Sequence, residues 1–99
     1  GKPMAGISIY DGDVKDKTTG KSTAAVLIAE VNGSNAKAAG LKKGDQIISV
    51  DNEKVSTAEG VISAIQSHRI GETVKLGILR DGKEMTISVK LQSSAEIKK

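Results

Sequence analysis

The sequence predicts an α+β fold made mostly of β-strands, with two helices. Residues Thr73 to Arg80 and Glu84 to Leu91 alternate between apolar and polar side chains, and the Asp81-Gly82 pair between them is a strong β-hairpin signal. Residues 24–31 (AAVLIAEV) form a nearly continuous apolar run, which is typical of a central strand. Apolar residues at helical spacing between Thr57 and Ser67 predict the longer helix.

The first strand is predicted where Ile7 and Ile9 alternate with Ser8 and Tyr10, since this is a period of two residues. Residues 11–22 (DGDVKDKTTGKS) are polar, highly charged and interrupted by glycines. We therefore expect a loop between the first strand and the apolar run.

Capping residues predict where the two helices begin. The first helix is expected to start at Ser34 or Asn35 and to end before Gly40, a residue suited to the left-handed position after a helix. The second follows a turn at Asp51-Asn52 and is expected to be capped by Ser56 or Thr57.

Residues 38–51 (AAGLKKGDQIISVD) place two glycines and two lysines directly before an apolar strand, and this pattern has two interpretations. Glycines and lysines can cradle a phosphate, or the glycines can simply reverse the chain. A phosphate loop needs a helix after its glycines, whereas here the strand Gln46 to Val50 follows. We therefore interpret Gly40 as a helix stop and Gly44-Asp45 as a turn.

Composition excludes several classes of function. The chain has 99 residues, enough for one domain, and a single aromatic residue, Tyr10, which argues against stacking platforms for single-stranded nucleic acid. Its net charge of +3 arises from 15 basic and 12 acidic residues that are interleaved, so we expect a mixed surface and no nucleic-acid partner. No cysteine is present, which excludes disulfides, thiolate zinc sites and cysteine nucleophiles.

Candidate catalytic and metal-binding residues are few. His68 is the only histidine and is interpreted as a capping or surface residue, because no GxSxG or comparable motif accompanies it. Asp11, Asp13 and Asp16 are spaced loosely like a calcium loop, but the glycine and the closing glutamate of that motif are missing. We expect no enzymatic activity from this chain, no metal site and no cofactor.

Several segments together resemble a bacterial PDZ domain of the kind carried by HtrA/DegP-type serine proteases. They are PMAGISI, the run VLIAEV, AAGLKKGDQIISVDNEKV, the helix STAEGVISAIQ and the RDGKE hairpin, and the resemblance covers residues 4 to about 91. Similar domains occur in membrane metalloproteases, carboxy-terminal processing proteases and secretion components. The resemblance implies a permuted PDZ fold, in which Thr86 to Leu91 supply the strand that comes first in metazoan domains. This fold is a five- to six-stranded, mostly antiparallel sandwich or partly open barrel with two helices.

The resemblance also implies a function, which is to bind extended peptides or protein C-termini by adding a strand to a sheet edge. The N–H groups of Ala5, Gly6 and Ile7 would bind the terminal carboxylate. The pairing strand would comprise Ile7, Ser8, Ile9 and Tyr10. Met4, Ala58, Ile62 and Ile65 would line the groove and its pocket, which predicts an apolar last residue in the ligand. The alternative interpretation of the helical stripe is ordinary core packing.

The resemblance further implies one PDZ domain over residues 1–99, with its core at about 4–91 and a polar tail at 92–99. We expect an extracytoplasmic, monomeric, substrate-binding or regulatory module of a protease, which would reach a membrane only through a segment of its parent protein. Two alternatives remain at this point. One is anion binding by lysines at positions 37, 42, 43 and 54, and the other is self-association through the edge strand.

Overall fold

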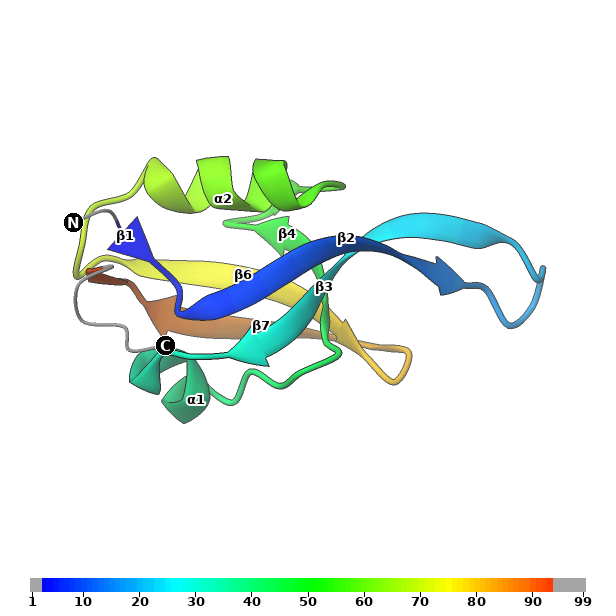
Figure 1. The fold of residues 1–99 in the computed structure, drawn as a ribbon, viewed down its shortest axis with the longest axis horizontal. Helices are drawn as coiled ribbons and strands as arrows, with labels where there is room; N and C mark the ends of the chain where they lie inside the picture. Colours follow the sequence, from blue (N-terminus) through cyan, green and yellow to red (C-terminus); the bar gives the residue numbers. More distant parts are fainter. Residues whose placement is uncertain (1–2, 94–99) are drawn as a thin grey trace.

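The computed structural model describes residues 3–93 and confirms the α+β fold (Figure 1). The helices are α1 (Ser34–Ala39) and α2 (Ala58–Gln66). The strands are β1 (Pro3–Met4), β2 (Ile7–Lys15), β3 (Ser22–Val31), β4 (Gln46–Val50), β5 (Glu53–Lys54), β6 (Thr73–Arg80), β7 (Lys83–Lys90) and β8 (Gln92–Ser93). None of the helices in residues 3–93 is long and apolar enough to cross a membrane.

The main sheet is antiparallel, has six strands and is not closed. Its order is β2-β3-β4-β6-β7, with the short strand β5 paired to β4. β2 is therefore an edge strand, as the sequence predicts for Ile7 to Tyr10. In Figure 1, α2 lies across one side of the sheet above β2 and β4, while α1 lies on the other side near β7. The free edge of β2 thus runs beside α2.

The core is built from aliphatic side chains. Val61 and Ile65 of α2 and Ala36 of α1 are buried against residues of the sheet. The largest fully buried side chains are Ile28, Ile47, Leu76, Ile78, Leu91, Val26, Val50, Val61, Val74 and Val89. Burying so many branched side chains is the main stabilising term for the fold, and it fixes α2 against the sheet.

The predicted loop at residues 11–22 is partly wrong, because half of these residues belong to strands. β2 continues to Lys15 and β3 begins at Ser22, so only residues 16–21 form the turn. There the Gly20 N–H donates to the Asp16 carbonyl at 2.8 Å. We call residues 12–25 the hairpin arm, which projects from the body of the domain (Figure 1). Its two strands satisfy each other's backbone groups while most of their side chains face water, so the apolar alternation that marks a half-buried strand is absent.

The predicted polar tail is also partly wrong. Gln92 and Ser93 pair with Met4 and Pro3, and the Gln92 side chain is buried. Its Oε1 accepts a hydrogen bond from the Asn35 N–H at 3.2 Å, at the start of α1. The N-cap residue of α1 is Gly33, not the predicted Ser34 or Asn35, so a distant glutamine replaces the local cap. The rest of the predicted tail, 94–99, lies outside the described residues.

The predicted turns are confirmed. Gly40 ends α1 in the left-handed conformation with φ +98°, and Gly44 has φ +92°. Asp81 and Gly82 both have positive φ, at +51° and +81°, as a two-residue type I′ hairpin requires. The glycines between α1 and β4 therefore reverse the chain.

An ion pair fixes the loop between α1 and β4. Asp45 is only 3% exposed and accepts hydrogen bonds from Arg80 Nε at 2.8 Å and from the Lys42 N–H at 3.0 Å. Arg80 also donates to the Gly40 carbonyl at 2.8 Å. Burial alone would raise the pKa of Asp45, but the hydrogen bonds from Arg80 and Lys42, together with their positive charges, hold it below its ordinary value.

Candidate functional site

A groove of about 410 Å³ lies between β2 and α2. Its apolar walls are partly open to water, since Ile62 is 45% exposed and Met4 is 38% exposed. The lining residues are Met4, Ala5, Ile7, Ser8, Ile9, Ile62, Ile65 and Gln66. A mostly apolar groove beside an unpaired strand edge has the shape and chemistry to hold an extended peptide.

Most of the predicted groove residues lie together, and the differences are local. Tyr10, predicted as part of the pairing strand, lies in β2 but does not line the groove. Ala58 does not line it either, since it packs against the core at the first position of α2. Gln66 does line the groove although it was not predicted, and its position four residues after Ile62 on one helical stripe is the signal that could have identified it.

The carboxylate-binding loop predicted at Ala5, Gly6 and Ile7 has an unusual backbone. Gly6 has φ +79°, and its carbonyl accepts hydrogen bonds from the N–H groups of Asn32 at 2.7 Å and Gly33 at 2.8 Å. In a trans peptide the N–H points opposite to the carbonyl, so the Ile7 N–H points away from Asn32 and Gly33. Within residues 3–93, nothing accepts a hydrogen bond from the N–H groups of Ala5 and Gly6.

Close backbone packing holds this loop in place. A Cβ atom added at Gly6 would lie 2.7 Å from Gly33 Cα, and one added at Gly33 would lie 2.8 Å from Gln92 Oε1. Neither position has room for a side chain. The loop is therefore fixed before any ligand arrives, which lowers the entropic cost of binding.

The helix α2, which forms the other wall, is held by an N-terminal cap and by two buried side chains. Thr57 caps α2, since its Oγ1 accepts a hydrogen bond from the Gly60 N–H at 3.0 Å. Val61 is fully buried and Ile65 is 6% exposed, while Ile62 is the exposed member of the stripe. Val61 therefore belongs to the core, Ile65 to both core and groove, and Ile62 to the groove wall.

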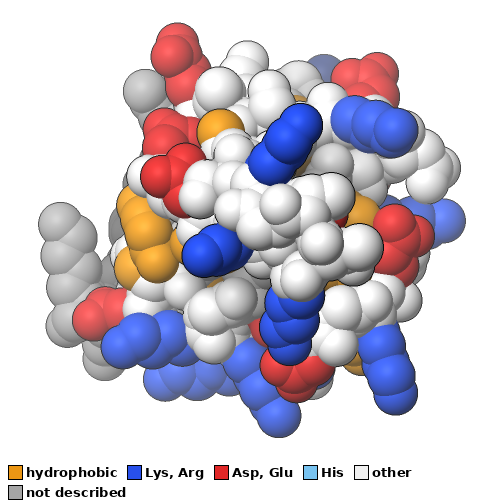
Figure 2. Space-filling view, turned by 90° about the vertical axis from the view of Figure 1, so that its right-hand side faces the viewer, with side chains coloured by type: hydrophobic (Ala, Val, Ile, Leu, Met, Phe, Trp, Pro, Cys, Tyr) orange, Lys and Arg blue, Asp and Glu red, His pale blue; other side chains and the backbone are white. Residues whose placement is uncertain are grey.

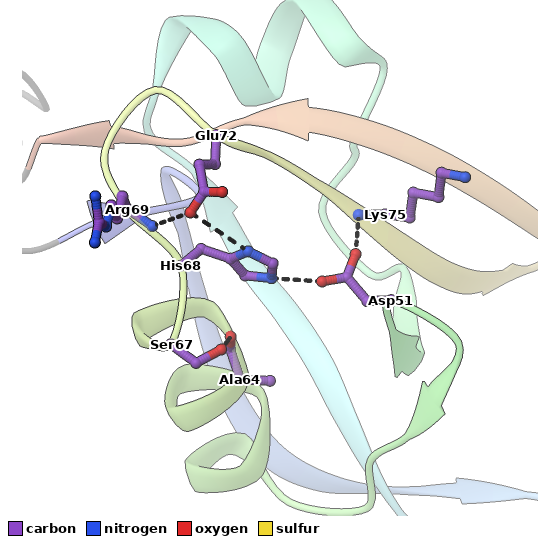
Figure 3. A network of polar contacts seen from close by, with 7 residues as sticks. All are labelled: Asp51, Ala64, Ser67, His68, Arg69, Glu72 and Lys75. Carbon is purple, nitrogen blue, oxygen red and sulfur yellow. Dashed lines mark hydrogen bonds and ion pairs between the residues drawn. The ribbon is translucent and has the colours of Figure 1, made fainter.

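Polar contacts also fix the chain that follows α2 (Figure 3). His68 Nε2 contacts Asp51 Oδ2, and its Nδ1 lies 3.8 Å from Glu72 Oε1. Asp51 in turn accepts a hydrogen bond from the Lys75 N–H at 3.0 Å. The nearby Ser67 hydroxyl donates to the Ala64 carbonyl at 2.6 Å and not to the His68 ring. This histidine ties the end of α2 to the turn after β4, and among residues 3–93 its ring contacts carboxylates and no serine or threonine hydroxyl.

Charged side chains are spread over the surface. Figure 2, which looks toward the end of the molecule that carries the hairpin arm, shows basic and acidic side chains on the same face. Within residues 3–93, no group of three or more His, Asp or Glu side chains is placed to hold a metal ion. Asp11, Asp13 and Asp16 lie along β2 and its turn.

A model of the PDZ domain family matches residues 6–91. The chain belongs to the PDZ domain family. The match spans β2, both helices and the hairpin of β6 and β7, and it ends one residue before the buried Gln92.

Several curated relatives of this PDZ domain are HtrA-type proteases, and one is named "Putative zinc metalloprotease". The domain is 35% identical over 85 residues to "Serine protease Do-like HtrA" of Lactobacillus helveticus, covering 86% of this chain and 20% of that protein. It is 38% identical over 84 residues to "Probable periplasmic serine endoprotease DegP-like" of Bartonella henselae, covering 85% of this chain and 17% of that protein. The domain thus spans about a fifth of the length of these relatives, and it is a PDZ domain of the HtrA family.

Among solved structures, the fold is similar to the HtrA3 PDZ domain bound to a phage-derived ligand, FGRWV. The TM-score is 0.72 at 17% identity, and the similarity covers 92% of this chain and 86% of that one. At this identity the likeness concerns the fold. It confirms the predicted PDZ architecture of an open antiparallel sheet with two helices.

Proposed function

We propose that the domain binds peptides with a free, apolar C-terminus in the groove between β2 and α2. One observation carries the proposal: the N–H groups of Ala5 and Gly6, without an acceptor in residues 3–93, lie next to the unpaired edge of β2. The HtrA3 PDZ domain, which has a similar fold, is bound to a peptide whose last residue is valine. That peptide has the apolar end that this groove would accept.

Three contacts would hold the ligand. Its carboxylate would accept hydrogen bonds from the N–H groups of Ala5, Gly6 and Ile7, which form a backbone nest. Its backbone would add an antiparallel strand to the edge of β2. Its last side chain would enter the apolar pocket lined by Ala5, Ile7, Ile9, Ile62 and Ile65. A short peptide loses much conformational freedom on binding, so we expect an affinity on the order of micromolar.

This binding activity fits a substrate-binding or regulatory module of an HtrA-like serine protease outside the cytoplasm. Two of the curated relatives are named as serine proteases, one of them as periplasmic, and a third relative, named as a zinc metalloprotease, represents the alternative parent. The domain would present protein C-termini to the catalytic domain, or would shift the parent protein between conformations when a peptide binds. We expect the isolated domain to be a monomer. Self-association through the edge of β2 would block the edge to which we propose the peptide is added.

The test compares a free-acid peptide with its C-terminally amidated form. Removing the carboxylate charge eliminates charge-assisted hydrogen bonds worth about 1.5 to 3 kcal/mol, so affinity should fall tenfold or more. An NMR titration should move the amide signals of Ala5, Gly6 and Ile7 most strongly for the free acid. As a second test, Ile62→Asp should abolish binding while leaving the fold intact, because Ile62 is exposed.

Two outcomes would contradict the proposal. Equal binding of the amidated and free-acid peptides would show that the loop does not recognise a carboxylate. Signal changes confined to Lys37 through Lys43 would instead indicate an anion site on the opposite side of the sheet. Size-exclusion chromatography over a concentration series separates peptide binding from self-association through β2.

A further inference from the structure

The edge strand continues beyond the groove without changing its alternation. The register of β2 and β3 shifts between Ser8 and Ile9, but the extra residue, Ala29, belongs to β3. Side chains of β2 at odd positions therefore stay on one face, and Ile7 and Ile9 line the groove on that face. A Cβ added at Gly12 would lie 3.0 Å from the Tyr10 ring, which places the even positions on the other face.

The next two odd positions are Asp11 and Asp13, at the end of the groove where α2 begins. Asp11 Oδ1 accepts a hydrogen bond from the Ala58 N–H at 2.7 Å, which bridges β2 to the first residue of α2. This bond fixes the carboxylate and leaves its second oxygen available to a ligand. Asp13 lies one step further along the same face, in the hairpin arm. The mostly apolar groove thus ends at two carboxylates, those of Asp11 and Asp13.

The negative charge at this exit is not compensated by the domain itself. Within residues 3–93, no ion pair involves Asp11, Asp13 or Glu59. Across the β2–β3 pair, Asp11 and Asp13 face the apolar residues Val26 and Ala24. Glu59 lies on the helical stripe of Ile62 and Gln66, which line the groove, and adds a third carboxylate from α2. The end of the groove where α2 begins is therefore locally acidic, although the net charge of the chain is +3.

The proposed binding mode sets which ligand residues meet these carboxylates. With its carboxylate at Ala5 and Gly6, an antiparallel peptide places its last residue opposite Ile7, where its side chain enters the pocket. The residue two positions earlier lies opposite Ile9. The residues four and six positions before the end then lie opposite Asp11 and Asp13. Directly opposed residues share a face, with Cβ atoms about 4.5–5.5 Å apart, so opposite charges there attract.

We propose that the domain selects C-terminal peptides that carry lysine or arginine four and six positions before an apolar last residue. This specificity rests on the proposed function, since the register follows from carboxylate binding. The next odd position of β2 is Lys15, whose positive charge would repel a basic ligand residue, so the preference for basic residues does not extend to the ligand position opposite Lys15. The recognised segment is therefore about seven residues long, apolar at its end and basic upstream.

The experiment uses three free-acid octapeptides with the same apolar last residue, and with lysine, alanine or glutamate at both upstream positions. Binding is measured by fluorescence anisotropy at low and high salt. The lysine peptide should bind about fivefold more tightly than the alanine peptide at low salt, because two opposed charge pairs add, and the glutamate peptide should bind most weakly. The difference should shrink at high salt.

A charge-removing variant tests the two carboxylates. In the double variant Asp11→Asn and Asp13→Asn, asparagine at position 11 keeps the oxygen that accepts the Ala58 N–H. This variant should lose most of the preference for the lysine peptide, because only Glu59 remains as a carboxylate at this end of the groove. The matched control, Glu53→Gln with Glu84→Gln, removes two charges from exposed positions outside the groove and should keep the preference for lysine.

Each outcome decides between the two proposals. Equal affinities for all three peptides in the wild-type domain would overturn the charge preference and leave carboxylate binding in place. A preference that is undiminished after removal of the charges of Asp11 and Asp13, or that disappears in the control variant, would overturn it as well. If none of the free-acid peptides binds, both proposals fail together.

Discussion

Two turns of this domain contain glycines with positive φ but differ in the hydrogen bonds that their backbone N–H groups make. Residues 40–45 include Gly40 and Gly44, both with positive φ. Residues 5–7 include Gly6, also with positive φ. From the glycines and neighbouring lysines, the first turn is the more obvious candidate for an anion site.

The N–H groups of the first turn are already used inside the domain. Gly40 donates to the Lys37 carbonyl at 3.1 Å, and Gly44 donates to the Ile28 carbonyl at 2.8 Å. Lys42 donates to the Asp45 carboxylate, which occupies the position that an anion would take. The loop at residues 5–7 has the opposite arrangement, because its carbonyl at Gly6 is used, whereas within residues 3–93 the N–H groups of Ala5 and Gly6 have no acceptor. The hydrogen-bond partners of the backbone, rather than the number of glycines, therefore distinguish a structural turn from the loop that we propose binds a carboxylate.

The largest expected effect comes from Gly6→Ala. A Cβ at this position would lie 2.7 Å from Gly33 Cα, and alanine is also strained at φ +79°. Because the clash is with backbone, the free energy of unfolding should fall by about 3 kcal/mol. Chemical denaturation measures this change. A loss below that of Gly40→Ala would show that the loop is not tightly packed.

The next effect comes from Asp45→Ala, which would leave the Lys42 N–H and the Arg80 guanidinium without their carboxylate. Losing these charge-assisted hydrogen bonds from a buried group should lower the free energy of unfolding by about 2 kcal/mol. It would also free an N–H in the first turn. Urea denaturation of the variant measures the loss, and an unchanged midpoint would contradict the role of this ion pair.

The same ion pair makes part of the stability depend on pH. The folded state holds the pKa of Asp45 below its ordinary value of 3.8, so its contribution is complete above that pH and is lost as the pH falls through the lowered pKa. Thermal melts of the wild type and Asp45→Asn between pH 7 and pH 2 measure this. The difference in Tm between them should narrow below about pH 4, and a constant difference would exclude a titrating carboxylate.

The smallest effect is expected for Gly40→Ala. Position 40 has φ +98°, but an added Cβ would meet no atom within 4 Å. Only the strain of the left-handed conformation remains, so the loss should be about 1 kcal/mol. Gly6→Ala combines this conformational strain with a steric clash, so the difference between the two losses in unfolding free energy measures the clash alone. Equal losses in the two variants would remove the distinction between the turns.

The sequence predicts most of the fold because its signals are local. Gly40, Gly44 and the Asp81-Gly82 pair mark chain reversals, and Thr57 marks the start of α2. The groove was predicted from the helical stripe of Ile62 and Ile65 together with the family resemblance. Exposure of Ile62 now separates the groove wall from the core, which helical spacing alone does not do.

The parts that were missed depend on contacts between distant residues or on strands with little apolar patterning. The hairpin arm has polar residues on both faces, so a two-residue period in hydrophobicity is missing there. The pairing of β1 with β8 joins strands of two residues from opposite ends of the described chain. The bridge from Asp11 to Ala58 spans 47 residues, and nothing near Asp11 in the sequence indicates its partner.

The pairing of β1 with β8 has a mechanical consequence in a longer polypeptide. Pro3 lies opposite Ser93, so the two segments that would connect the domain to a longer polypeptide are attached side by side. Tension between the flanking segments would peel this two-residue pair apart one hydrogen bond at a time, without shearing the six-stranded sheet. Met4 is joined directly to Ala5 and Gly6, so the first step of such peeling would pull on the loop that we propose binds the peptide carboxylate.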